Sequence, residues 1–311
     1  MMRTGLLWLS EQQQVFRFVR RNPVARKFAS RFVAGESIET AIDAVRDLNR
    51  RRVTATLDLL GESVREERDA VQARETYLRM LDQIAEAGVE SNVSLKLTQM
   101  GFDISEDACF ANMTAILDQA KARQNFVRID MEGSAYTQRT LDFFYHRLYP
   151  VYGAHVGVVI QSCLRRSAAD IDRLIEQRAR VRLCKGAYLE PSDVAFPDKA
   201  DVDRAYVQLM ERLLERGNYP ALATHDAAVI ARARDFVARQ KIDPARFEFQ
   251  MLYGVRRDLQ DALRKAGFNV RVYVPFGTQW YPYLMRRLAE RPANIAFILG
   301  NVVREAVHRP A

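Results

Sequence analysis

Charged side chains interrupt apolar runs at several points of this sequence. Lys96 stands inside "SLKL", Asp130 ends "VRID", and Arg182 lies inside "VRLCK". A strand that is buried on both faces is normally apolar throughout, and a buried charge without a partner is strongly destabilising. These charges are therefore expected to face a binding site. The plain alternative is that Lys96 and Asp130 form a buried ion pair that only stabilises the fold.

A second group of charges lies near the C-terminus, in "YLMRRLAERPAN". Tyr283, Arg286, Arg287 and Glu290 are spaced i, i+3, i+4 and i+7, which places them on one side of a helix. A guanidinium presents forked donors that match the two oxygens of a carboxylate. Together with Lys96, the two arginines could hold a substrate carboxylate. The same stripe could equally be a solvated face with Arg–Glu ion pairs.

Further polar residues end or interrupt other apolar runs, namely Gln161, Arg182, Lys185, Thr224, His225 and Tyr273. Each has an ordinary structural explanation. Arg182 and Lys185 could extend from strand ends to solvent, His225 could be a satisfied core histidine, and Tyr273 could simply pack. The functional interpretation depends on whether one fold brings all these positions to the same place.

Short apolar or β-branched runs recur roughly 23 to 40 residues apart, and each is followed by a longer helical pattern. Eight such runs predict strands within residues 52–61, 92–101, 126–133, 155–162, 180–188, 221–227, 246–252 and 269–277. Eight β–α units favour an α/β fold of the (βα)8 TIM-barrel type. An open doubly wound sheet is less favoured, because no GxGxxG or GxxxxGK[ST] motif is present.

We therefore predict a barrel over residues 51–311, preceded by a helical N-terminal arm over residues 1–50. In such barrels, the functional groups lie at the carboxyl ends of the strands. The polar residues described above fall late in their strands, so all of them are expected at one mouth of the barrel.

The charge of the chain is unevenly distributed. The net charge is +8, and residues 1–52 carry 11 Lys/Arg against 5 Asp/Glu, which leaves +2 for the remainder. The basic arm could touch an acidic membrane or protein surface, or it could be an ordinary soluble helical arm. No apolar run approaches the ~18 residues of a spanning helix. A cytoplasmic protein is expected, with at most peripheral contact with the inner face of the cell membrane.

Metal and serine hydrolase chemistry are disfavoured. The three cysteines show no CxxC spacing, the four histidines are scattered without an HExxH motif, and no GxSxG elbow is present. No metal site is predicted, and the cysteine usage is typical of a reducing compartment.

Taken together, the segments resemble the proline dehydrogenase family, both the monofunctional bacterial type and the corresponding domain of bifunctional proline-utilisation flavoenzymes. The resemblance covers residues 50–303, is loose before residue 50, and is carried by "VSLKLTQMG", "RIDMEGS", "VVIQSCLRR", "VRLCKGAY", "LATHD", "FEFQMLYG", "VRVYVPFGT" and "YLMRRLAERPAN".

The resemblance implies oxidation of L-proline to Δ1-pyrroline-5-carboxylate, the first step of proline catabolism to glutamate. It implies non-covalent FAD, with hydride passing to flavin N5 and electrons passing to a membrane quinone. A separate pyrroline-5-carboxylate dehydrogenase is expected to carry out the next oxidation, because 311 residues leave no room for a second catalytic domain.

The resemblance also implies roles for individual residues. Asp130 and Arg182 are the expected catalytic residues, with Asp130 beside Lys96 and Arg182 against flavin N5. The substrate-binding residues are expected to be Lys96, Arg286 and Arg287 for the carboxylate, and Tyr188, Leu252, Tyr273 and Tyr283 for the ring. The remaining FAD contacts are expected from Met131, Gln161, Lys185, Gly186, Ala187, Thr224, His225 and Glu290. One departure is Asp226 in "LATHD", where many relatives are expected to have Asn.

Two other classes of function stay open at the level of the sequence. A Schiff-base lyase or aldolase could use Lys96 or Lys185 as its amine. A nucleic-acid or membrane-surface binder could use the basic arm, but the nearly neutral remainder of the chain argues against nucleic acid as a partner.

Overall fold

Eight parallel strands close into a barrel in the order of the sequence, with β8 pairing back onto β1. The computed structural model describes residues 29–290, with side chains as far as Met285. The strands are β1 (Thr54–Leu59), β2 (Ser91–Leu95), β3 (Val127–Ile129), β4 (Val156–Gln161), β5 (Arg180–Cys184), β6 (Ala221–Ala223), β7 (Glu248–Leu252) and β8 (Asn269–Phe276). The predicted barrel is confirmed, and only β2 begins earlier than predicted, by one residue.

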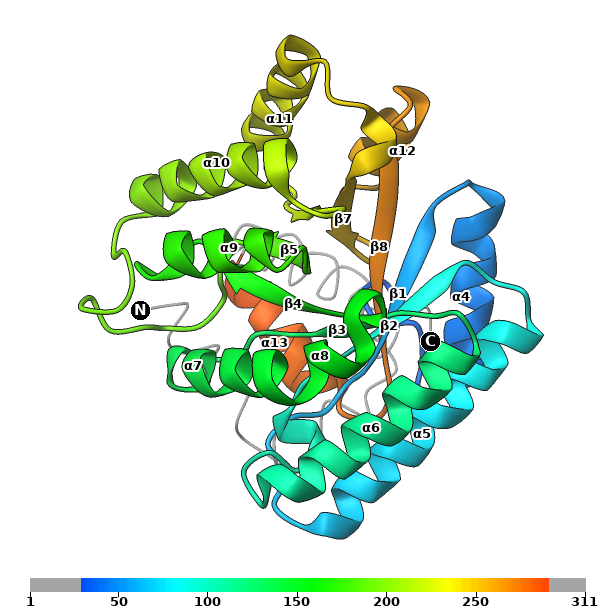
Figure 1. Ribbon diagram of the computed structural model, residues 1–311. Helices are drawn as coiled ribbons and strands as arrows, with labels where there is room; N and C mark the ends of the chain where they lie inside the picture. Colours follow the sequence, from blue (N-terminus) through cyan, green and yellow to red (C-terminus); the bar gives the residue numbers. More distant parts are fainter. Residues whose placement is uncertain (1–28, 291–311) are drawn as a thin grey trace, which may run out of the picture.

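Helices separate the consecutive strands and surround the barrel (Figure 1). The α-helices are α4 (Ile38–Arg50), α5 (Glu67–Glu86), α6 (Glu106–Ala122), α7 (Ser134–Phe143), α8 (Tyr149–Tyr152), α9 (Ser167–Glu176), α10 (Lys199–Arg216), α11 (Ala227–Gln240), α12 (Arg257–Lys265) and α13 (Trp280–Glu290). Short helical turns complete the connections, namely η1 (Thr98–Met100), η2 (Phe144–Leu148), η3 (Gly153–His155) and η4 (Pro244–Arg246). Helices α5 and α6 lie side by side along one flank (Figure 1).

Side-chain alternation makes the interior of this barrel polar. In β1, Ala55 and Leu57 belong to the hydrophobic core between strands and helices. The alternate residues Thr56 and Asp58 are also buried, and by alternation they point into the barrel. Barrels of this type usually fill their interior with branched apolar side chains. Polar residues at these positions must instead find hydrogen-bond partners across the barrel.

Helix α4 packs on the barrel wall. Ser37 caps it by accepting a hydrogen bond from the Thr40 N–H, and Ile42, Val45 and Leu48 lie in the same core as the strands. This helix lies within residues 1–50, the segment predicted to be helical. The domain boundary at residue 50 stays a prediction, and residues 1–28 of the predicted arm lie outside the described part of the chain.

A second, smaller hydrophobic cluster anchors the start of α13. Trp280, Tyr281, Leu284 and Met285 are buried in this cluster, which also contains Leu60, the residue directly after β1. The Trp280 indole donates a hydrogen bond to Glu36, 3.1 Å away. Between residues 29 and 290, no helix is both long and apolar enough to cross a bilayer.

Candidate functional site

The polar residues predicted to carry chemistry stand at the carboxyl ends of the strands. Lys96 directly follows β2, Asp130 follows β3, Gln161 ends β4 and Lys185 follows β5. Thr224 and His225 follow β6, Leu252 ends β7, and Tyr273 lies in the second half of β8. Because all eight strands are parallel, these positions share one mouth of the barrel.

The central contact of this mouth is an ion pair between Asp130 and Arg182. Their Oδ1 and Nη1 atoms are 2.7 Å apart, and both side chains are largely buried. The second carboxylate oxygen of Asp130 accepts a hydrogen bond from the Tyr273 hydroxyl at 2.8 Å. Ser94 also donates to Asp130, at 2.7 Å. The buried ion pair considered from the sequence therefore forms with Arg182 and not with Lys96.

The Arg182 guanidinium is fixed on two of its three nitrogens. Nη1 donates to Asp130, and Nε donates to Gln250 at 2.5 Å. Nη2 is buried and has no hydrogen-bond partner among the described residues. A buried donor without a partner costs free energy, so this nitrogen is suited to a ligand that brings an acceptor.

Asp58 in β1 is a buried carboxyl that the sequence interpretation missed. Only 1% of its surface is exposed, and neither carboxyl oxygen has a hydrogen-bond partner in the described part of the chain. Burial raises the pKa of Asp58 to about 6, against the opposing effect of the Lys96 cation. The sequence does contain a signal for Asp58, namely a charged residue inside an apolar run. Asp58 interrupts "TLDLL" in the way that Lys96 interrupts "SLKL".

Lys96 remains a cation in this setting. Burial alone would lower the pKa of its ammonium group, but the nearby Asp58, Glu62 and Asp130 carboxylates raise the pKa above its ordinary value. A buried ammonium in the company of carboxylates is suited to binding an anionic substrate group.

The ends of β4 and β5 are shaped by Gln161 and Gly186. The Gln161 amide donates to the main-chain carbonyls of Met131 and Glu132, at 3.2 and 3.0 Å. Gly186 has a φ of +103°, and a Cβ placed there would lie 2.4 Å from the Cys163 sulfur. Only glycine fits this turn without strain. The half-buried residues Ala187 and Tyr188 follow directly.

The ends of β5 and β6 are tied together by Lys185 and Asp226. The Lys185 ammonium lies 2.6 Å from Asp203 and 2.8 Å from Asp226. Asp226 also caps α11 by accepting hydrogen bonds from the Ala228 and Val229 N–H groups. Burial alone would lower the pKa of Lys185, but the two carboxylates raise it. Asp226, which stands where many relatives are expected to have Asn, therefore has a structural role in this protein.

His225 has a defined main-chain contact. Its Nε2 accepts a hydrogen bond from the Leu252 N–H at 2.9 Å, which requires the ring to carry no proton at Nε2. The neighbouring Thr224 hydroxyl accepts from the Asp226 N–H at 3.1 Å. Both residues therefore order the loops at the mouth, and their predicted contact with FAD stays a prediction.

Helix α13 carries the remaining predicted residues. Tyr283 is buried in the same hydrophobic cluster as Trp280. Arg286, Arg287 and Glu290 belong to the helix, but their side chains lie outside the described residues. Their predicted roles stay predictions.

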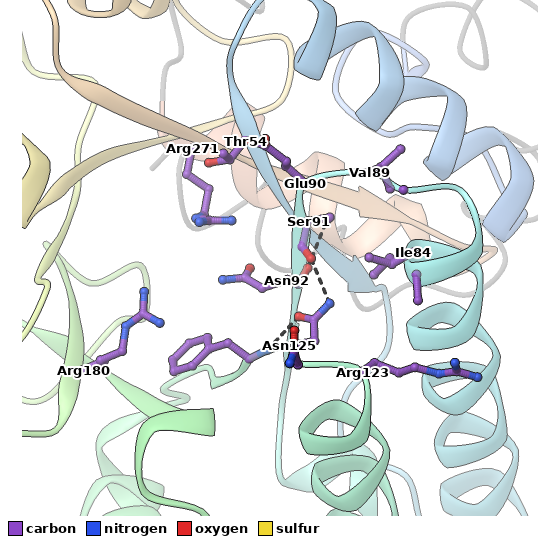
Figure 2. A pocket seen from close by; sticks show the side chains of 14 residues that line it. Thr54, Ile84, Val89, Glu90, Ser91, Asn92, Arg123, Asn125, Arg180 and Arg271 are labelled. Atoms are coloured by element: carbon purple, nitrogen blue, oxygen red, sulfur yellow. Dashed lines mark hydrogen bonds between the residues drawn. The ribbon is translucent and has the colours of Figure 1, made fainter.

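A cavity of about 450 Å³ opens at the opposite end of the barrel (Figure 2). Its lining includes Thr54, Ser91 and Arg180, the first residues of β1, β2 and β5, together with Arg271 near the start of β8. None of the predicted site residues lines this cavity. Within residues 29–290, no group of three or more His, Cys, Asp or Glu side chains is arranged to hold a metal ion.

Comparisons with known proteins agree with this geometry. The family model described as proline dehydrogenase matches residues 41–299. The chain is 42% identical to proline dehydrogenase 1 of Bacillus subtilis (strain 168), over 98% of this chain and 100% of that protein. It is 41% identical to the proline dehydrogenase of Deinococcus radiodurans, over 97% of this chain and 98% of that protein.

A solved structure shares the fold. The crystal structure of proline utilization A from Bdellovibrio bacteriovorus, inactivated by N-propargylglycine, superposes with a TM-score of 0.81 at 26% identity. The match covers 89% of this chain and 34% of that chain. A family model that spans most of the sequence and full-length relatives above 40% identity give the same assignment. This chain belongs to the proline dehydrogenase family of oxidoreductases.

Proposed function

We propose that this protein oxidises L-proline to Δ1-pyrroline-5-carboxylate with non-covalently bound FAD, and that a quinone accepts the electrons. The observation that carries the proposal is the Asp130–Arg182 pair. It is buried at the carboxyl ends of the strands, and the Nη2 of Arg182 has no hydrogen-bond partner among the described residues. When bound, FAD supplies a hydride acceptor for the ring carbon next to the proline nitrogen.

The residues at the mouth fit a flavin. Arg182 offers a buried donor, and the Gly186 turn leaves no room for a side chain between itself and Cys163. Arg182 would hold the isoalloxazine ring, and Met131, Gln161, Lys185, Gly186, Ala187, Thr224, His225 and Glu290 would hold the remainder of FAD.

Lys96 would bind the proline carboxylate, together with Arg286 and Arg287 of α13. A cation next to the carboxylate also favours loss of the proton from the substrate ammonium group by like-charge repulsion. A neutral nitrogen lone pair is required before hydride can leave the adjacent carbon. Tyr188, Leu252, Tyr273 and Tyr283 would then hold the ring in place, and such positioning contributes substantially to catalysis.

Tyr273 would act as a neutral donor throughout the reaction. Burial raises the pKa of its hydroxyl well above the ordinary value, and the neighbouring Asp130 and Asp58 carboxyls act in the same direction. The hydroxyl can therefore keep its hydrogen bond to Asp130 and so fix the carboxylate that orients Arg182.

A Schiff-base mechanism has less support. A nucleophilic lysine must lose its proton, and enzymes achieve this by lowering the pKa of the amine. The carboxylates around Lys96 and Lys185 raise the pKa of each ammonium group instead.

The remaining proposals concern partners. The product would pass to a separate pyrroline-5-carboxylate dehydrogenase, and the basic arm would bring the protein into peripheral contact with a membrane that holds the quinone. Purified protein is expected to be yellow and to reduce a soluble quinone when L-proline is added. A protein that takes up no FAD and reduces no quinone with proline would contradict the proposal.

A further inference from the structure

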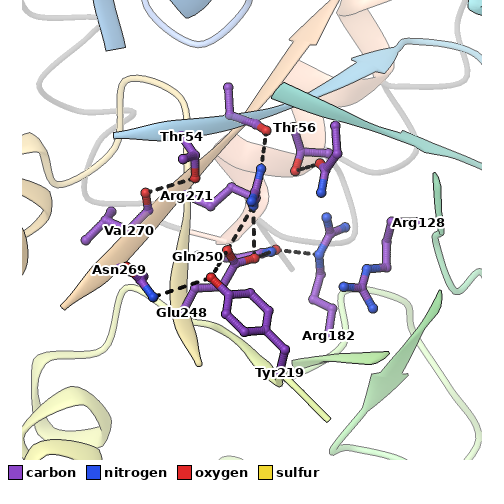
Figure 3. Close-up of polar contacts among 12 residues, drawn as sticks. Thr54, Thr56, Arg128, Arg182, Tyr219, Glu248, Gln250, Asn269, Val270 and Arg271 are labelled. Carbon is purple, nitrogen blue, oxygen red and sulfur yellow. Dashed lines mark hydrogen bonds and ion pairs between the residues drawn. The ribbon is translucent and has the colours of Figure 1, made fainter. Parts of the chain in front are cut away.

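A series of hydrogen-bonded polar side chains runs through the interior of the barrel, from Arg182 to the cavity at the opposite end. Arg182 Nε donates to the Gln250 side-chain oxygen at 2.5 Å, and the Gln250 amide donates to Glu248 at 2.6 Å (Figure 3). Glu248 in turn accepts from Arg271 Nε at 2.9 and 3.0 Å. All four residues come from β5, β7 and β8, and Arg271 also lines the cavity of Figure 2.

Arg271, the last residue of this series, is held in place by a main-chain contact. Arg271 Nη1 donates to the Ala55 main-chain carbonyl at 2.6 Å, which ties it to β1. Burial alone would raise the pKa of Glu248, but the Arg271 guanidinium holds the pKa below its ordinary value. Glu248 is therefore an anion that can only accept hydrogen bonds.

This anion determines which way the Gln250 amide points. Because Glu248 has no proton to donate, Gln250 must present its NH2 group to the carboxylate. Its oxygen is then directed at Arg182 Nε, where it can accept. With the opposite orientation, two donors would face each other at Arg182 and two acceptors would face each other at Glu248.

Two separate contacts are needed to fix a guanidinium. Asp130 and Ser94 both accept from Nη1, at 2.7 and 3.3 Å, whereas Gln250 supplies the contact on Nε, so the guanidinium plane is held at two separate nitrogens. Gln250 is only 3% exposed, so water does not readily replace it.

We infer that Gln250 is a positioning residue, oriented by the Glu248–Arg271 pair, which holds the Arg182 guanidinium so that Nη2 faces the cofactor. The inference rests on the proposed function, because it takes Arg182 to contact FAD. It adds that the catalytic geometry at one mouth of the barrel depends on a charged pair near the other.

The first test replaces Gln250 with Met, which keeps the length of the side chain and removes the acceptor. Gln260→Met is the matched control, because Gln260 is also buried but donates to the Val255 carbonyl and makes no contact with Arg182. With FAD-loaded enzyme, Gln250→Met is expected to lower kcat about 10- to 100-fold, since small misplacements of catalytic groups have effects of this size. The KM for proline should change by less than about twofold, because proline binding is not altered.

Two readouts separate positioning from general destabilisation. The visible flavin spectrum of Gln250→Met should shift, and the Arg182 Nε–H should exchange faster with solvent in NMR spectra of the holoenzyme. Gln260→Met should change neither, even where it lowers the melting temperature equally. A Gln250→Met enzyme with wild-type kcat, spectrum and Nε–H exchange would overturn the inference.

The second test exchanges the amide and the carboxylate. Gln250→Glu alone places two carboxylates against each other and should lower kcat. The double variant Glu248→Gln/Gln250→Glu restores one amide facing one carboxylate, and it should recover at least about tenfold in kcat if the two side chains act as a coupled pair. A double variant no faster than Gln250→Glu would overturn the role of Glu248.

These experiments distinguish failure of the proposed function from failure of the inference about Gln250. A wild-type protein that binds no FAD or leaves proline unoxidised would overturn the proposed function and this inference with it. A wild type that does both, matched by Gln250→Met in every readout, would overturn this inference alone.

Discussion

Arg182 and Asp130 are joined at 2.7 Å across the barrel interior, although β3 and β5 are separated by β4. The pair therefore links two parts of the wall that share no main-chain hydrogen bonds. It also brings a guanidinium with an available donor to the mouth where the other predicted site residues lie.

Loss of Asp130 should be costly for folding as well as for activity. Asp130→Ala leaves Arg182 as a buried charge without its partner, so the free energy of unfolding should fall by about 3–5 kcal/mol. Asp261→Ala is the control, because the Arg51–Asp261 pair is partly exposed to solvent and should contribute at most about 1 kcal/mol. Urea unfolding of both variants gives the comparison. Equal losses would show that the buried pair does not stabilise the barrel.

Lys96 should contribute to substrate affinity. Lys96→Met removes a cation proposed to bind the proline carboxylate, and a hydrogen bond to a charged group contributes about 1.5–3 kcal/mol. The KM for proline should therefore rise roughly 10- to 100-fold with FAD content unchanged. The control is Lys199→Met, which alters an exposed lysine. A wild-type KM for proline in Lys96→Met would show that Lys96 does not bind the substrate carboxylate.

Asp58 should make stability depend on pH in a definite direction. Its pKa is raised from 3.8 to about 6, so the folded protein binds a proton more tightly than the unfolded chain between these values. The free energy of unfolding contributed by Asp58 must therefore fall as pH rises through this window. Above the window, the wild type carries the full cost of the buried charge.

Asp58→Asn removes this dependence. Relative to the wild type, the variant should gain up to about 3 kcal/mol of stability as pH rises from 4 to 6, because each pKa unit corresponds to about 1.4 kcal/mol. Chemical unfolding at several pH values measures the difference, with exposed Asp47→Asn as the control. A difference that stays constant or decreases with pH would contradict the assignment.

Gly186 should be needed for the shape of the cofactor site. Gly186→Ala adds a methyl group 2.4 Å from the Cys163 sulfur at a positive φ, so both strain and overlap result. Gly267→Ala is a matched control, since Gly267 also has a positive φ but no atom lies within 4 Å of the added Cβ. The control should lose on the order of 1 kcal/mol, and Gly186→Ala should lose more and also bind less FAD. Equal FAD content in the two variants would show that the Gly186 turn does not contribute to FAD binding.

The sequence was sufficient for the barrel because its signals are local. Each strand is a short apolar run with a helix after it, and the rule that function lies at the carboxyl ends of barrel strands correctly predicts that Lys96, Asp130 and Arg182 share one mouth. The same pattern of a charge in an apolar run is present at Asp58. A carboxyl in a short run is also compatible with a strand end in solvent, and only the closed barrel shows that this one points inward.

The pairing of charges could not be predicted in this way. Whether Asp130 pairs with Lys96 or Arg182 depends on how far the strands are staggered around the barrel, and the sequence does not state that stagger. Glu248, Gln250 and Arg271 escaped notice for another reason. Glu248 and Arg271 stand early in their strands and Gln250 at mid-strand, away from the functional mouth, and their importance becomes visible only through contacts between neighbouring strands.

The most direct test of the proposed function is an anaerobic titration of the purified protein with L-proline, followed by its visible absorbance. The protein should show a flavin spectrum that bleaches as proline is added and returns when a quinone is supplied. Lys96→Met should need more proline to reach the same bleaching. A flavin spectrum that proline leaves unchanged, or a protein that retains no flavin after FAD is added, would contradict the assignment of this site to proline oxidation.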